Sequence, residues 1–321
     1  MKPILHAALL LAFTTPIAAF AQNSPLLGAN QAQLVGDLKD EANAPARLRA
    51  QVLLDRAHFG TGEIDGRWGS NTGRAIAAFQ RSRDLEPTGA MDEATWRALT
   101  ADASPALVEY RLTAQDIAGP YTAIPEDMMA KAALPQLGFG SLAESLGERF
   151  HASPALLAAL NPGADLTREG TTLWVPNVQG AALAKAATVV VDKSDSSVML
   201  RDESGRVYAR FPASTGSSHD PLPIGKWTIK GVGRDPHFQY NPKLFWDADA
   251  GHAKARIAPG PNNPVGVVWV DLSKDHYGIH GTPEPGKIGK TESHGCIRLT
   301  NWDAVAVAAA VGPGTPAVLQ Q

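Results

Sequence analysis

The spacing of apolar residues changes along the chain, and in the N-terminal part it is typical of α-helices. Between residues 46 and 99 they recur at helical intervals, on faces that hold Leu48, Val52, Leu53, Ala75, Ile76 and Phe79. Asn71 and Asp92 precede the second and third of these segments and have side chains that are preferred as N-caps. We therefore predict a small three-helix bundle over residues 46–100.

The middle of the chain has weaker signals. Residues 101–135 are mixed and contain proline, and no element is assigned to them. Two short helices are predicted at residues 141–150 and 154–160, the second with Ser153 as its N-cap and Pro154 at its first position. Residues 172–176 are expected to form a strand that ends at a proline.

After residue 187 the sequence pattern changes to short runs of β-branched and aromatic residues. They predict strands at residues 188–192, 197–201, 207–212, 226–232 and 265–270. One helix is expected at residues 302–310, with Asn301 as its cap. The fold class is thus multidomain, with a mainly antiparallel β domain over residues 187–321.

Residues 1–21 have the features of a secretory signal peptide. Lys2 supplies the positive charge, residues 9–13 the apolar centre, and Ala19-Phe20-Ala21 the small residues before cleavage. An uncleaved anchor is the alternative. Residues 22–45 are predicted to be a linker, and no other apolar run is long enough to span a bilayer. We expect a protein without a transmembrane span, secreted across the inner membrane to the periplasm or cell wall.

Charge and cysteine content narrow the chemistry. The 321 residues include 29 basic and 32 acidic side chains, a net charge of -3. This balance argues against nucleic acid as a partner, because phosphate backbones need a concentrated basic surface. A single cysteine excludes an internal disulfide and, in a monomer, four-thiolate metal sites. In an oxidising compartment Cys296 is either buried and inert or retained for its reactivity.

Cys296 belongs to a group of residues suited to acyl transfer. His280 precedes it by sixteen residues, on a predicted strand, and a reversal through the Pro/Gly-rich loop would bring the two together. An imidazole can take the thiol proton and return it to a leaving amine. Gly295 leaves neighbouring backbone N–H groups open, as an oxyanion hole requires.

The run Ile279-His280-Gly281-Thr282, followed by Ser293-His294-Gly295-Cys296-Ile297-Arg298, resembles the signature of the YkuD-type L,D-transpeptidases. Residues 223–227 and 260–266 also resemble that family, and the likeness covers about residues 187–320. One departure is Leu222, where the family more usually has threonine before Pro-x-Gly. This departure leaves the catalytic assignment unchanged and concerns only the substrate contacts of that segment.

The resemblance implies a role for each motif residue. Cys296 would be the nucleophile, His280 the general base, and the Gly281 carbonyl the group that orients His280. Backbone N–H groups around Gly295 and Cys296 would form the oxyanion hole. The remaining motif residues are assigned to substrate binding: Ser293, His294 and Arg298. For His294, loop ordering is favoured over proton transfer. Arg298 would bind a carboxylate of the stem peptide or make a local ion pair.

The family reaction begins with attack of the Cys296 thiolate on the carbonyl between the third residue and D-Ala of a peptidoglycan tetrapeptide stem. D-Ala leaves, and an amine of a neighbouring stem then attacks the thioester, giving a 3→3 cross-link. Neither a metal nor an organic cofactor is required. Attachment of a wall protein, exchange of the terminal D-amino acid and hydrolysis share this acyl-enzyme and remain open alternatives.

Two upstream segments resemble wall-binding modules. The run Ile64-Asp65-Gly66-x-x-Gly69-x-x-Thr72, continued to Gln80, is similar to a three-helix peptidoglycan-binding domain over residues 46–100. Residues 134–178 resemble a LysM module, a βααβ unit that binds glycan strands, although its first strand is poorly marked. A plain helical hairpin is the alternative for this second segment.

Three other functions were weighed against the transpeptidase. A zinc hydrolase could use His276 and His280, but on a strand these positions are about 13 Å apart, and no Glu stands between them. A non-catalytic wall-binding protein would not need the complete His, Cys and Gly set. A papain-like peptidase would place its His far downstream of the Cys, whereas here it precedes the Cys closely.

Overall fold

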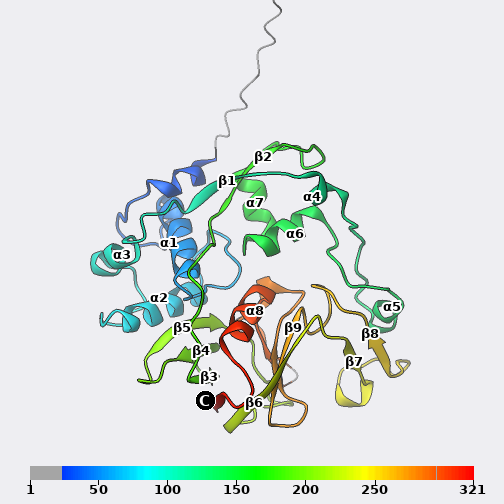
Figure 1. Cartoon of the computed structure of the whole chain (residues 1–321). Coiled ribbons are helices and arrows are strands. Elements are labelled where there is room, and N and C mark those ends of the chain that lie inside the picture. Colours follow the sequence, from blue (N-terminus) through cyan, green and yellow to red (C-terminus); the bar gives the residue numbers. More distant parts are fainter. Residues whose placement is uncertain (1–23, 294) are drawn as a thin grey trace, which may run out of the picture.

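The computed structural model describes residues 24–293 and 295–321, so the predicted signal peptide and His294 lie outside the described residues. A helical N-terminal region is followed by a curled, mainly β C-terminal domain (Figure 1). No helix among the described residues is long and apolar enough to cross a membrane.

The first region holds the three predicted helices: α1 (Ala44–Arg56), α2 (Ser70–Ser82) and α3 (Glu93–Leu99). Their apolar faces share a core with Phe59 and Phe79, whose rings meet edge to face at 5.6 Å. Asp92 caps α3 by accepting from the Thr95 N–H at 2.7 Å, as predicted. The prediction for Asn71 was wrong: α2 begins at Ser70, and the Asn71 amide donates to the Ile288 carbonyl oxygen of the β domain at 2.9 Å.

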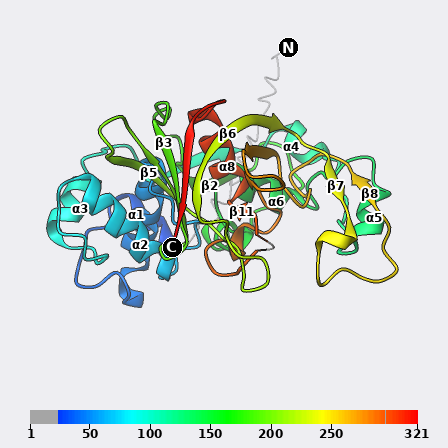
Figure 2. The same cartoon turned by 90° about the horizontal axis from the view of Figure 1, so that it is seen from below.

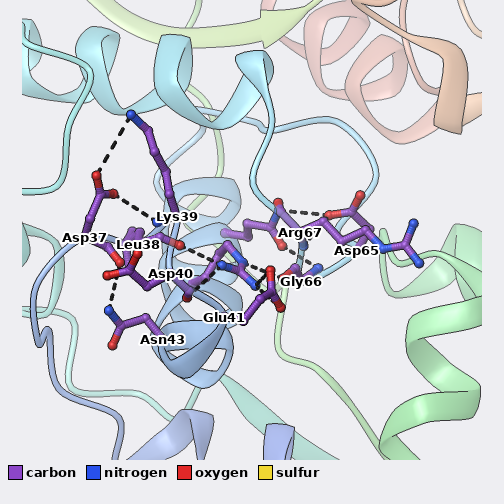
Figure 3. A network of polar contacts seen from close by, with 11 residues as sticks. Asp37, Leu38, Lys39, Asp40, Glu41, Asn43, Asp65, Gly66 and Arg67 are labelled. Carbon is purple, nitrogen blue, oxygen red and sulfur yellow. Dashed lines mark hydrogen bonds and ion pairs between the residues drawn. The ribbon is translucent and has the colours of Figure 1, made fainter.

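Figure 3 shows the network of polar contacts around Asp65, Gly66 and Arg67 of the loop between α1 and α2. Two buried polar side chains of α1 hold the loop backbone: Arg47 Nε donates to the Gly66 carbonyl oxygen at 2.7 Å, and Gln51 accepts from the Gly66 N–H at 2.8 Å. Asp65 accepts from the Arg67 N–H at 2.8 Å, which closes the turn. Gly66 has a φ of 70°, a conformation that glycine adopts without strain.

A βααβ unit follows, and it begins earlier than residue 134. Strand β1 (Leu107–Arg111) pairs antiparallel with β2 (Thr172–Pro176), and α6 (Leu142–Arg149) and α7 (Pro154–Leu160) pack beside them. Ser153 caps α7 as predicted, by accepting from the Leu156 N–H at 3.0 Å. The first strand was missed because some thirty residues separate it from the helices. This inserted segment, residues 112–140, is called the strap.

The strap carries α4 (Ala114–Ala118) and α5 (Met128–Ala132) away from the βααβ unit. Figures 1 and 2 both show α5 beside the hairpin of β7 (Phe238–Tyr240) and β8 (Ala255–Ile257), at the edge of the β domain. We call residues 235–258 the flap. Residues 101–135, to which no element was assigned, thus include a strand and a connection between two modules.

The C-terminal domain is built on an eight-stranded sheet in the order β11-β10-β9-β6-β12-β3-β4-β5. Its strands are β3 (Thr188–Asp192), β4 (Ser197–Arg201), β5 (Val207–Pro212), β6 (Gly225–Arg234), β9 (Val268–Leu272), β10 (Gly278–His280), β11 (Ile297–Arg298) and β12 (Pro316–Gln320). The sheet is mixed rather than wholly antiparallel, because β12 pairs parallel with β3 and β10 parallel with β11. Helix α8 (Asn301–Ala310) packs its apolar side into the core of this sheet.

Polar contacts join the three parts. The backbone of β5 exchanges hydrogen bonds with the α1–α2 connection, where the Gly60 N–H donates to the Arg210 carbonyl oxygen at 2.9 Å. The Ile64 N–H donates to the His151 carbonyl oxygen of the βααβ unit at 2.8 Å. The described residues also include four short 3-10 helices: Pro25–Asn30, Glu41–Asn43, Pro242–Leu244 and Pro285–Lys287. The three modules are therefore in direct contact with one another and are not joined by linkers alone.

Candidate active site

Two short neighbouring strands bring the predicted nucleophile and base into one place. Strand β10 ends at His280, and β11 begins one residue after Cys296, with Ile279 opposite Ile297 in the register. The strands run parallel, so the predicted simple reversal between them was wrong. Residues 281–296 instead cross over, and Cys296 lies beside the start of β10.

His280 is fully enclosed and held in one orientation. Its Nδ1 lies 2.7 Å from the Gly281 carbonyl oxygen, and its ring stacks on Trp269 at 5.4 Å. A carbonyl only accepts, so the proton lies on Nδ1 and the lone pair on Nε2. Burial lowers the pKa of His280 to about 4, the Gly281 hydrogen bond raises it, and the Arg298 charge lowers it further. The ring is therefore neutral at pH 7 and has the form that accepts a proton.

Cys296 is the free thiol of the described chain, and it is partly exposed. Its Sγ donates to the His276 carbonyl oxygen at 3.7 Å. Burial raises the pKa of the Cys296 thiol, against the lowering effects of a Gly278 backbone hydrogen bond and the Arg298 charge. The resting pair is thus a neutral thiol with a neutral imidazole. Proton transfer has to accompany attack, because the thiolate is the nucleophilic form.

The glycine before Cys296 has a conformation that few other residues adopt. Gly295 has a φ of 97°, and a Cβ there would lie 3.0 Å from the Tyr277 ring. The sequence predicts the oxyanion hole at the backbone N–H groups of this turn.

The remaining motif residues have different surroundings. The buried Ser293 hydroxyl donates to the Cys296 carbonyl oxygen, so it fixes the turn around Cys296. Arg298 Nη2 donates to the Glu292 carbonyl oxygen at 3.1 Å, and burial is the largest influence lowering the pKa of this guanidinium. His294 lies outside the described residues.

The flap reaches over this region from the strap side. Trp246 near its tip stacks on His219 at 4.8 Å, and the loop of His219 is joined to the nucleophile turn by a hydrogen bond from the Ser217 N–H to the Ser293 carbonyl oxygen at 3.1 Å. A cavity of about 510 Å³ lies between the flap and His276. The cavity therefore lies next to the residue whose backbone carbonyl meets Cys296 Sγ.

Asn301 is a site residue that the sequence analysis missed, because it was assigned as a helix cap. Thr300 caps α8 instead, accepting from the Asp303 N–H at 3.2 Å. Asn301 Oδ1 accepts a hydrogen bond from the Val267 N–H, and Asn301 Nδ2 donates to the Pro261 carbonyl oxygen, both at 3.2 Å. Its Oδ1 would lie 2.0 Å from a Cβ on Gly281, so only glycine fits beside His280. A buried Asn pressed against the His-Gly pair could be recognised only from the fold.

The metal hypothesis receives no support from the geometry around His276. This residue precedes β10 in a turn, with a φ of 67°, and its side chain is exposed. Within residues 24–293 and 295–321, no group of three or more His, Cys, Asp or Glu side chains is placed to hold a metal ion.

Comparison with known proteins decides the family of the β domain. The family model of the L,D-transpeptidase catalytic domain, YkuD, matches residues 186–319. Residues 186–319 are a YkuD-type L,D-transpeptidase domain. A second family model, that of a peptidoglycan binding domain, matches residues 43–99. Both resemblances are confirmed, and the LysM-like assignment of the βααβ unit stays a prediction.

Curated relatives carry the same family name. YkuD of Bacillus licheniformis, named as an L,D-transpeptidase, is 29% identical over 178 residues, which span 55% of this chain and 92% of the relative. YbiS of Escherichia coli K12 is 28% identical over 149 residues, 44% of this chain and 48% of the relative.

Solved structures show more distant similarity. L,D-transpeptidase 3 of Mycobacterium tuberculosis, crystallised with a faropenem-derived adduct, has 19% identity and a TM-score of 0.35, over 49% of this chain and 77% of that one. An L,D-transpeptidase from Xylanimonas cellulosilytica has 16% identity and a TM-score of 0.37, over 86% of this chain and 93% of that one.

Proposed function

We propose that this protein is an exported L,D-transpeptidase that forms an acyl-enzyme on Cys296 from a peptidoglycan tetrapeptide stem and transfers it to an amine, giving 3→3 cross-links. The observation that carries the proposal is His280, which is neutral, enclosed and bonded through Nδ1 to the Gly281 carbonyl oxygen at 2.7 Å, on the strand beside Cys296. This contact leaves Nε2 free as a base.

The proposed chemistry balances with these residues alone. Cys296 Sγ attacks the carbonyl carbon between the third stem residue and D-Ala while its proton passes to His280 Nε2. Backbone N–H groups of the Gly295–Cys296 turn stabilise the oxyanion. When the C–N bond breaks, Nε2 returns the proton to the D-Ala amine, and a thioester remains. The acceptor amine then repeats these steps in reverse order and releases Cys296 as a thiol.

The N-terminal modules are proposed to hold the enzyme on its polymer. The peptidoglycan binding domain would tether the chain, which raises the local concentration of stems. The βααβ unit has a cavity of about 400 Å³ lined by Arg111, Leu112, Thr113, Glu169 and Gly170, and we assign glycan binding to it. A wall-attached protein as acceptor belongs to the same proposal, because it differs only in the amine supplied.

The test is a product analysis with purified muropeptides and the full chain. Mass spectrometry is expected to show dimers joined between third residues, with one D-Ala released per dimer. Tripeptides alone would identify a carboxypeptidase, and exchanged terminal residues an exchange enzyme. Unchanged substrate would contradict the proposed function.

A further inference from the structure

The cavity beneath the flap extends to His276, a neighbour of Cys296. Tyr240, Lys254 and Arg256 contribute to its wall from the flap, and His276 closes its other side. The carbonyl of this same His276 accepts the hydrogen bond from Cys296 Sγ at 3.7 Å. A substrate whose scissile carbonyl reaches Sγ therefore places neighbouring groups within reach of this cavity.

The charge of the cavity is one-sided. Its eight lining residues include Lys254 and Arg256 but neither Asp nor Glu. In the part of the chain that the structure describes, neither cation forms an ion pair. Two cations on one wall of a cavity that holds no acidic side chain form a receptor for an anion.

The strap holds this wall from behind. Tyr240 Oη lies 2.8 Å from His252 Nδ1, and His252 Nε2 lies 2.7 Å from the Asp127 carboxylate at the start of α5. His252 is two residues before Lys254, so the contact anchors the segment that carries both cations. Apolar residues of the strap, among them Leu137, share a core with Tyr240 and Ile257 of the flap.

The far end of the flap is fixed as well. The Leu137 N–H donates to the Pro259 carbonyl oxygen at 2.9 Å, and the Asn262 N–H donates to the Leu137 carbonyl oxygen at 3.0 Å. A Cβ on Gly260 would lie 2.1 Å from that carbonyl oxygen, so the two backbones are in close contact. The backbone that carries Lys254 and Arg256 is thus held in place before any ligand arrives, while both side chains are exposed and can turn toward a ligand.

We propose that this cavity is a carboxylate-binding subsite for the stem peptide, with Lys254 and Arg256 as its ligands. The inference rests on the proposed function and adds that the flap binds a carboxylate group of the stem peptide. A tetrapeptide stem offers two such groups near the scissile bond: the terminal carboxylate of D-Ala and, in stems with a diacid at the third position, the side-chain carboxylate. Either would gain charge-assisted hydrogen bonds from a guanidinium and an ammonium.

The test measures binding separately from catalysis. The full chain with Cys296→Ala is titrated by calorimetry with three tetrapeptides: the free acid, the third-residue side-chain carboxamide and the D-alaninamide. Lys254→Met and Arg256→Gln are then added singly and together. Lys243→Met is the matched control, because Lys243 is an exposed cation of the same flap that does not line the cavity.

One amide is expected to bind about tenfold or more weakly than the acid, the range of a charged hydrogen bond, and the double variant is expected to abolish that difference. The amide that shows this effect identifies the carboxylate that is read. The control is expected to leave the ratio unchanged. Equal acid-to-amide ratios with and without the two cations, for both amides, would overturn the subsite. Absence of any Cys296 adduct in the unmodified enzyme would overturn the proposed function instead.

Discussion

The ring of His151, from the βααβ unit, lies parallel to the ring of Trp302 on α8, with centroids 4.9 Å apart and planes within 8° of each other. His151 Nδ1 also meets the Asp55 carboxylate of α1 at 2.9 Å. One side chain therefore joins all three modules. Trp302 is the second residue of α8, and α8 follows β11 almost directly in the chain. The junction is therefore close in sequence to Cys296.

This junction predicts a pH-dependent stability. Burial raises the pKa of Glu148 and of Asp303 to about 7. Burial lowers the pKa of His151, but Asp55 outweighs it and the net shift is upward. All three groups thus hold more protons in the folded chain than in the unfolded one near neutral pH. Their stabilising contribution is complete below about pH 4 for the carboxyls and is lost as pH rises through about 7.

We expect Glu148→Gln to flatten the fall in unfolding free energy between pH 5 and 7 by up to about 1.4 kcal/mol per pH unit. Urea unfolding at several pH values measures this slope. Glu86→Gln, at an exposed position, serves as the control and is expected to keep the wild-type slope. An unchanged slope in Glu148→Gln would show that this carboxyl ionises normally in the fold.

The pH profile of acylation follows from His280. Because burial lowers its pKa to about 4, the base is already deprotonated at mildly acidic pH. We expect kcat/KM for acylation to rise with pH through about 4 and to show no further step near 6.5. Stopped-flow acylation by a carbapenem, a class that the family resemblance implies as a reagent, would measure it. A limb centred near 6.5 would mean that His280 is solvated in the free enzyme.

The packing of Gly281 against Asn301 predicts a steric effect on catalysis. In Gly281→Ala the new methyl would lie 2.0 Å from Asn301 Oδ1, so the carbonyl that orients His280 has to move. We expect kcat to fall by about 10²-fold or more, the usual contribution of a positioned base, with a smaller change in KM. Gly312→Ala is the control, since a Cβ there meets nothing within 4 Å.

Removal of the obstructing side chain refines this prediction. The double variant Gly281→Ala with Asn301→Gly is expected to recover part of the lost kcat, because the methyl then has space. A double variant as slow as the product of the two single effects would contradict a clash between these residues.

The contact between strap and flap predicts a change in flap dynamics. His252→Ala removes the bonds to both Tyr240 and Asp127 while leaving the helix cap made by Asp127 intact. We expect faster amide hydrogen exchange in residues 235–258 and a higher KM for stem peptides, with acylation by a carbapenem less affected. His237→Ala, at a residue of the same flap without a hydrogen bond to the described chain, is expected to behave as wild type. Unchanged exchange in His252→Ala would show that the apolar contacts alone hold the flap.

Local sequence patterns predicted those strands and helix caps that depend on side-chain type and neighbouring residues. The strands at residues 188–192 and 197–201 and the caps Asp92 and Ser153 follow from side-chain type and nearest neighbours, and they are confirmed. Non-local pairing was beyond such reasoning. Strand β12 has an ordinary C-terminal sequence, yet it lies inside the sheet between β3 and β6.

In the candidate site, too, the residues of short motifs were predicted from the sequence, and those that depend on tertiary packing were not. The predicted base and nucleophile are adjacent in short motifs, and the structure brings their strands together. Asn301 directly follows the Cys296 motif in the chain, but its contact with Gly281 depends on the fold. The flap, with Lys254 and Arg256, reaches His276 only through tertiary packing. The strap is the extreme case, because its few apolar residues find their partners some 110 residues later in the chain, at Tyr240 and Ile257.

The measurement that tests the central claim most directly is the intact mass of the full-length enzyme after brief exposure to a purified tetrapeptide stem. We predict an adduct equal to the stem minus D-Ala, located on Cys296 by peptide mapping, and its absence in a folded Cys296→Ala variant. Release of D-Ala by that variant, or an adduct on another residue, would contradict the account.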